Sequence, residues 1–148
     1  MAVCDSLPRN IRHVYTRSVP KLIPIGARGE AEETVVFDHT LTAHQPELPP
    51  VYSTPDMTRL MGTAAFHALQ PYCEGDEINV GTAINIQHLA ASTIGEHIRA
   101  EAVVESFDGR FYTLRVTAHS GDKDIGRGAV SRTVVSLGKL RAKYGGGR

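Results

Sequence analysis

Among the seven histidines of this sequence, His88 has the placement best suited to acid–base chemistry. It ends an alternating run whose other members on the same predicted strand face are Val80, Thr82, Ile84 and Ile86. A histidine at the mouth of an apolar core can take up or release a proton near neutral pH. A buried imidazole that only hydrogen-bonds to the backbone would give the same pattern, so the residues alone leave both roles open.

Thr54 is the second candidate, because it lies at the start of a predicted helix. In Ser53-Thr54-Pro55-Asp56 a hydroxyl able to cap the helix precedes a proline and a first-turn acid. Free N–H groups at a helix start can hold a carbonyl oxygen and the negative charge that develops on it. Capping alone would also explain Thr54, and the two roles are compatible. Asp56 could orient His88, although the helix dipole already accounts for an acid there.

The remaining chemistry-bearing residues form no metal or cofactor pattern. The other histidines fall on different predicted elements without HExxH-like spacing, and Cys4 and Cys73 form no CxxC pair. No GxSxG elbow, phosphate-binding glycine loop or dinucleotide fingerprint occurs. We therefore expect neither a metal nor a bound cofactor.

One long helix must position these candidates. Its apolar stripe is predicted to consist of Met57, Leu60, Met61, Ala64, Ala65, Ala68 and Leu69. Pro71 and the Glu74-Gly75-Asp76 cluster end the helix. Upstream, alternation over residues 34–41 predicts one strand, followed by a proline-rich connection.

The sequence after Gly75 alternates with the period of β-strands. Two inward faces are predicted, the first formed by Ile98, Ala100, Ala102 and Val104 and the second by Tyr112, Leu114, Val116 and Ala118. Asp108-Gly109 marks the hairpin between them, and a last strand runs from about Ile125 to Leu137. The order strand, helix, four strands predicts an α+β fold with one antiparallel sheet wrapped around a central helix.

Length and composition indicate one globular domain. The 148 residues carry zero formal net charge, with 41% hydrophobic and 22% charged residues. We predict an extended basic N-terminal arm at 1–30, the folded domain at 31–140 and a flexible basic C-terminal tail at 141–148. Balanced charge argues against nucleic-acid binding, and no apolar stretch suits a membrane span. A cytoplasmic location and a homodimer that covers a sheet edge are expected, and further pairing of two dimers stays open.

Three motifs occur together in this chain: Thr54-Pro55-Asp56-Met57, Val80-Gly81-Thr82 and the run from His88 to Glu96. In order and spacing they resemble the hot-dog-fold thioesterases of the fluoroacetyl-CoA thioesterase type, over about residues 31–140. The resemblance implies a hot-dog fold and a dimer with active sites at the subunit interface. It also implies acyl-CoA ligands, no metal, and catalysis by a threonine, a histidine and a glutamate.

Two of the three family residues match this sequence. Thr54 and His88 match the threonine and the histidine, and Gly81 matches a glycine at which a side chain would crowd the acyl group. The position of the glutamate is occupied by Gly62. Because glycine inside a helix costs about 0.5–1 kcal/mol relative to alanine, we expect Gly62 to leave space for substrate.

Arginines of the matching last strand complete the predicted site. Arg127 and Arg132 are candidates to bind the CoA phosphates, with Arg110 as an alternative and a solvated surface charge as the other interpretation of each. The leading hypothesis is hydrolysis of a small or medium acyl-CoA by water that His88 activates. The alternative is an acyl-CoA-binding or regulatory module that lost turnover with the glutamate. A hydratase ranks last, because Glu96 and His97 are adjacent rather than spaced.

Overall fold

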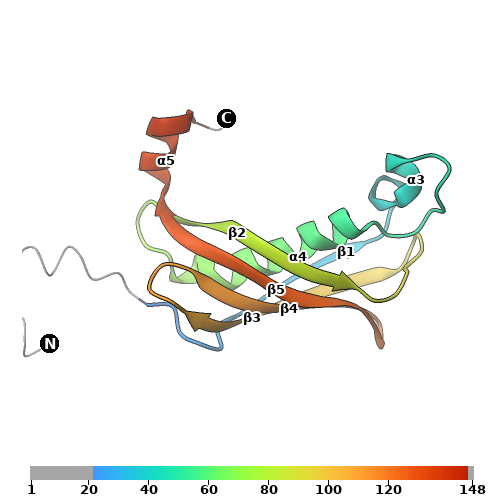
Figure 1. Cartoon of the computed structure of the whole chain (residues 1–148), viewed down its shortest axis with the longest axis horizontal. Helices are drawn as coiled ribbons and strands as arrows, with labels where there is room; N and C mark the ends of the chain where they lie inside the picture. Colours follow the sequence, from blue (N-terminus) through green and yellow to red (C-terminus); the bar gives the residue numbers. More distant parts are fainter. Residues whose placement is uncertain (1–21, 147–148) are drawn as a thin grey trace, which may run out of the picture.

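The computed structural model describes residues 22–146, so most of the predicted N-terminal arm lies outside the described residues. Five antiparallel strands form one sheet in the order β1-β3-β4-β5-β2. Their bounds are β1 (Arg28–Thr34), β2 (Glu77–His88), β3 (His97–Phe107), β4 (Tyr112–Ser120) and β5 (Lys123–Ser136). The sheet curls along the long helix α4 (Thr54–Leu69), as Figure 1 shows. The predicted α+β fold with one sheet wrapped around a central helix is confirmed.

Helix α4 follows its sequence pattern closely. All seven residues of the predicted stripe are buried, none more than 3% exposed. The N-cap is Ser53, whose hydroxyl accepts a hydrogen bond from the backbone N–H of Asp56. Thr54 is therefore the first helical residue and not the cap, which frees its side chain for another contact.

Strands β3 and β4 supply the centre of the sheet. Their predicted inward residues are all buried, and they line the core beneath α4. The Asp108-Gly109 turn joins the two strands, with Gly109 at φ 103°, a conformation that glycine adopts without strain. The hairpin predicted from this dipeptide is confirmed.

The first strand is displaced from its predicted position. Residues 34–41 were expected to be extended, but β1 ends at Thr34 and the chain continues into short helices η1 (Phe37–His39) and α3 (Leu41–His44). Val36 and Phe37 are 45% and 53% exposed, so the alternation there does not reflect a buried face. Pairing with β3 determines where β1 lies, and the sequence of β1 itself is rich in glutamate and poor in strand-forming residues.

Strand β2 contains a register shift between Gly81 and Ala83, where it pairs with β5. The extra residue reverses the alternation. Asn79 and Gly81 lie on the inner face before the shift, and Ile84, Ile86 and His88 lie on the same inner face after it. The spacing had suggested that Val80 and Thr82 share the inner face of His88. Because of the register shift, they do not.

The C-terminal boundary also differs from the expectation. After the short helix η2 (Gln70–Tyr72) and β2 to β5, the chain forms a further helix, α5 (Leu137–Tyr144), which includes residues 141–144 of the predicted flexible tail. Ser136 caps it and accepts from the N–H of Lys139. Among the described helices, none combines the length and apolarity needed to cross a membrane.

Candidate active site

Thr54 and His88 meet where the start of α4 faces the end of β2. Thr54 Oγ1 lies 2.9 Å from His88 Nδ1, a hydrogen-bonding distance. The two side chains border an open cavity of about 260 Å³. Its other lining residues are Leu41, Val51, Tyr52, Leu89, Ala90 and Ala91. The two residues predicted to carry the chemistry are thus brought together at a cavity wall.

The environment of His88 favours a neutral imidazole. Burial lowers the pKa of His88, and the neighbouring backbone of Ala90 opposes this only in part. The Nε2 atom is buried and has no hydrogen-bond partner among the described residues. The ring of Tyr52 stands edge-on to His88, with centroids 6.5 Å apart and the planes at 84°. Nδ1, toward Thr54, is therefore the nitrogen with a hydrogen-bonding role.

The backbone amides that follow Thr54 are not available to a substrate. Pro55 has no N–H, Asp56 donates its own to the hydroxyl of Ser53, and Met57 donates to the carbonyl of Ser53 at 3.0 Å. The prediction that these amides hold an oxyanion is therefore wrong. The remaining donors at this helix start are the N–H and the hydroxyl of Thr54.

Asp56 does not contact His88. Its carboxylate accepts from the Ser53 hydroxyl, lies 3.2 Å from His44 Nε2 and lies 3.9 Å from Arg59. Although burial acts to raise it, the hydrogen bonds from Ser53 and His44 keep the pKa of Asp56 below its usual value. Asp56 thus stabilises the first turn of α4 and is not the partner of the histidine.

A second cavity, of about 320 Å³, surrounds Gly62, two turns further along α4. Nothing lies within 4 Å of a Cβ built on Gly62, so a side chain there would enter open space. Gly81 borders the same cavity from β2, and a Cβ on it would lie 3.4 Å from the Arg132 guanidinium. Gly62, where the resemblance led us to expect a glutamate in the family, therefore faces open space.

Arg132 and Arg127 lie on opposite faces of β5. The guanidinium of Arg132 is half-buried, donates to the side chain and carbonyl of Asn79, and reaches the carbonyl of Gly62 at 3.4 Å. Burial lowers the pKa of Arg132, and none of the described carboxylates pairs with it. Arg127 borders a separate hollow beside Arg115. The two predicted phosphate contacts are not brought together within one chain.

Other sequence candidates lie away from both cavities. Arg110 sits over the ring of Phe111 in the β3–β4 hairpin. Glu96 bonds to Thr93, Ser120 and Lys123, which lowers its pKa to about 2. No group of three metal-ligating side chains gathers within residues 22–146.

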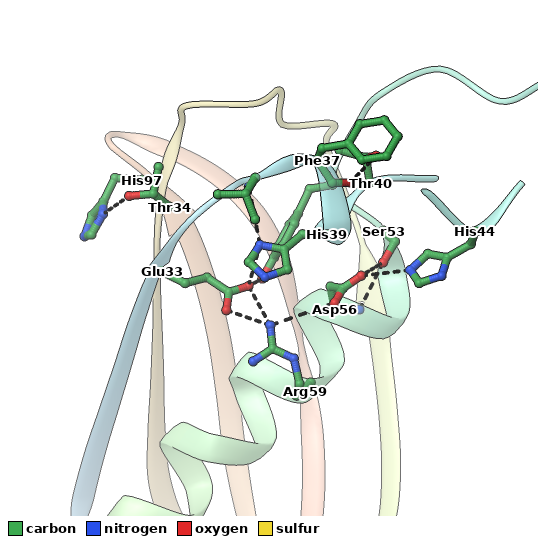
Figure 2. A network of polar contacts seen from close by, with 12 residues as sticks. Glu33, Thr34, Phe37, His39, Thr40, His44, Ser53, Asp56, Arg59 and His97 are labelled. Carbon is green, nitrogen blue, oxygen red and sulfur yellow. Dashed lines mark hydrogen bonds and ion pairs between the residues drawn. The ribbon is translucent and has the colours of Figure 1, made fainter. Parts of the chain in front are cut away.

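Sequence reasoning missed the residues behind His88. Tyr52 is only 1% exposed, and its hydroxyl donates to Glu33 Oε2 at 2.6 Å. Arg59 donates to both oxygens of Glu33, at 2.6 and 2.9 Å. Figure 2 shows Glu33 on β1 and Arg59 on α4 pointing toward one another. The available signal was an aromatic residue directly before the N-cap, a position that often packs against the helix.

The sequence and the fold of this chain resemble those of proteins of known family. A family model for fluoroacetyl-CoA-specific thioesterases matches residues 35–137. This chain belongs to that family. Over 97 residues it is 40% identical to the fluoroacetyl-CoA thioesterase of Streptantibioticus cattleyicolor, a stretch that covers 66% of this chain and 70% of that relative.

Solved structures of a thioesterase from this family confirm the hot-dog fold. The fluoroacetyl-CoA thioesterase FlK superposes with a TM-score of 0.75 at 34% identity, covering 83% of this chain and 96% of that one. A mutant of FlK in complex with acetyl-CoA gives a TM-score of 0.74 at 34% identity, covering 81% and 95%. The ligand bound by that relative is a CoA thioester.

Proposed function

We propose that this protein is an acyl-CoA thioesterase that hydrolyses a small or medium acyl thioester. The observation that carries the proposal is the 2.9 Å contact between Thr54 Oγ1 and His88 Nδ1 at the wall of a cavity. A hydroxyl beside a neutral imidazole is an arrangement suited to moving a proton off an attacking oxygen. Membership in a thioesterase family supports the same reaction.

The hydrolysis can be written with these two side chains. A water molecule attacks the thioester carbonyl carbon and passes one proton to the Thr54 oxygen, while the Thr54 proton moves to His88 Nδ1. The oxyanion is then stabilised by the N–H of Thr54. Collapse of the tetrahedral intermediate breaks the carbon–sulfur bond, and the His88 imidazolium protonates the thiolate. The products are a carboxylic acid and free CoA.

The acyl group is proposed to extend toward the cavity at Gly62. Open space at Gly62 and the neighbouring apolar side chains of Ile84 and Val130 suit a chain longer than acetyl. In this proposal Gly62 stands in for the family glutamate, so no carboxylate takes part and the water proton passes through Thr54 to His88. Gly81 keeps the opposite wall free of a side chain.

Contacts to the CoA phosphates are proposed for the arginines of β5. Arg127, beside Arg115, faces the open side of the sheet, whereas Arg132 is held near Gly62. Because they lie on opposite faces, each would meet a different part of the ligand. Neither a metal nor a further cofactor is required, and turnover should persist in the presence of a chelator.

A second candidate function is acyl-CoA binding without turnover. It is favoured by the lack of any described carboxylate hydrogen-bonded to Thr54 or His88, together with the void at Gly62. Such a module would bind acyl-CoA and sense it, and the same cavity would serve. A cytoplasmic location stays a prediction for either function.

A panel of acyl-CoA esters from acetyl to octanoyl separates the two candidates. Free thiol is measured colorimetrically, and binding of the same esters is measured by calorimetry. Release of thiol that depends on Thr54 and His88 supports the thioesterase. Binding without release of thiol for every ester supports the acyl-CoA-binding module. If the protein neither binds nor hydrolyses any ester, both candidate functions are rejected.

A further inference from the structure

Tyr52 joins the Thr54–His88 pair to a charged group outside the cavity. Its backbone is fixed by an N–H bond to the carbonyl of Ser92 at 2.8 Å and by a β-bridge to Thr40. Its ring forms part of the cavity wall and stands edge-on to the ring of His88. The separation of 6.5 Å lies within the range of favourable aromatic pairs. A change in the tilt of the Tyr52 ring would therefore alter the packing against the His88 ring.

The hydroxyl of Tyr52 is anchored from two elements. It donates to Glu33 of β1, and Glu33 in turn accepts twice from Arg59 of α4. The Glu33 side chain is only 14% exposed, and His39 approaches it at 3.7 Å. Burial, reinforced by the bond to Glu33, raises the pKa of Tyr52, so its hydroxyl stays a donor. Charge-assisted bonds of this kind are short and strongly directional.

His88 has few other groups to fix its orientation. In histidine-dependent active sites the second ring nitrogen is commonly held by a carboxylate or a carbonyl. Here Nε2 has no such partner within the described chain. The direction in which Nδ1 points must then depend on the contact with Thr54, on the nearby backbone of Ala90 and on the packing of the Tyr52 ring.

We propose that Tyr52 is a positioning residue for His88, with Glu33 and Arg59 fixing the Tyr52 ring from outside the cavity. This inference rests on the proposed thioesterase function for its kinetic consequence. A phenylalanine would fill the same volume, so the polar anchor is the part of the arrangement that packing alone does not require. Loss of the anchor leaves the ring in place but lets it and His88 move.

Tyr52→Phe tests the anchor, with Tyr112→Phe as the matched control. Tyr112 is also buried, and its hydroxyl accepts from the N–H of Ile23 at the opposite end of the sheet. Both variants lose one buried hydroxyl and should show similar falls in Tm. Only Tyr52→Phe should lower kcat, by about ten-fold with KM changed less than about two-fold, because it disturbs the reacting geometry. Glu33→Gln should give a smaller loss in the same direction.

The ring signals of His88 provide a readout that does not depend on turnover. In NMR titrations, assigned by their absence in His88→Asn, they should shift and broaden in Tyr52→Phe and stay unchanged in Tyr112→Phe. The pKa of His88 should move up toward its ordinary value as water gains access. Wild-type His88 signals and wild-type kcat in Tyr52→Phe would overturn the proposal. If the wild-type protein hydrolyses no ester, the thioesterase function fails, and the NMR comparison alone decides the role of Tyr52.

Discussion

Gly29 on β1 lies so close to Ala64 on α4 that an added Cβ would stand 2.2 Å from the Ala64 carbonyl oxygen. The approach also brings the backbone of Ala68 to 2.2 Å from the same point. Backbone cannot yield as a flexible side chain can, so only glycine allows the strand to pack against the helix here. Glu33, four residues along the same strand, is thereby brought within reach of Arg59 and Tyr52.

The two glycines Gly29 and Gly62 should respond in opposite ways to alanine. Gly62→Ala should raise the free energy of unfolding by up to about 1 kcal/mol, because the new methyl meets open space and restricts the unfolded chain. Gly29→Ala should destabilise by several times that amount or prevent folding. Chemical denaturation measures both. A destabilised Gly62→Ala would show that the position is not open.

Gly62 also provides a test of the resemblance to the family. Gly62→Glu should create or increase hydrolysis of short acyl esters, since its carboxylate would enter the cavity from the helix position that we propose corresponds to the family glutamate. Gly62→Ala should raise KM for hexanoyl-CoA and spare acetyl-CoA. If neither variant changes binding or turnover of any ester, Gly62 lies outside the substrate pocket.

Adjacent hydroxyls at the helix start should have separate roles. Ser53→Ala should cost about 0.5–2 kcal/mol of stability, because the N-cap bond is lost. Thr54→Val keeps the shape of the side chain and should leave the cap intact while abolishing most thiol release. Chemical denaturation and thiol release measured on both variants check that Ser53 caps the helix and Thr54 takes part in the reaction. Equal loss of stability in the two would contradict the assignment of the cap to Ser53.

The pH dependence of turnover should reflect the neutral form of His88. Burial lowers the pKa of His88 below its ordinary 6.5. At pH values above this lowered pKa the imidazole is unprotonated and able to accept a proton. With substrate saturating, kcat should rise with pH through a midpoint below 6.5 and level off above it. A midpoint above 7 would mean that another group accepts the proton.

A dimer is predicted from the exposed edge of β2. Residues 81–85 of this edge strand are all exposed, and the apolar residue Ile84 among them is 48% exposed. Light scattering at micromolar concentration should give about 32 kDa, twice the 16.1 kDa chain, and Ile84→Glu should shift the mass toward the monomer. A wild-type mass of about 16 kDa would contradict the prediction.

Local patterns predicted the elements whose residues carry their own signal. The α4 stripe repeats at helical spacing, and the inward faces of β3 and β4 alternate without interruption, so both were predicted residue by residue. Strand β1 has no such signal, because its place depends on pairing with β3 and on Gly29. The register shift near Thr82 is equally non-local, since it arises from pairing with β5.

The candidate site was predictable in part for the same reason. Thr54 and His88 each lie at the end of a well-patterned element, and those two ends meet. The link from Tyr52 through Glu33 to Arg59 joins three segments that are distant in sequence, and no spacing indicates it. The use of the Asp56 and Met57 amides by Ser53 could be known only once the cap was identified.

In the proposed reaction, His88 provides the proton acceptor for thioester hydrolysis. The most direct measurement is thiol release from the best acyl-CoA ester by His88→Ala, alongside His119→Ala, which alters a histidine paired with Asp124 away from both cavities. We expect His88→Ala to bind the ester, keep its fold and lose turnover by at least about 100-fold, while His119→Ala retains wild-type rates. Full turnover by a folded His88→Ala protein would contradict it.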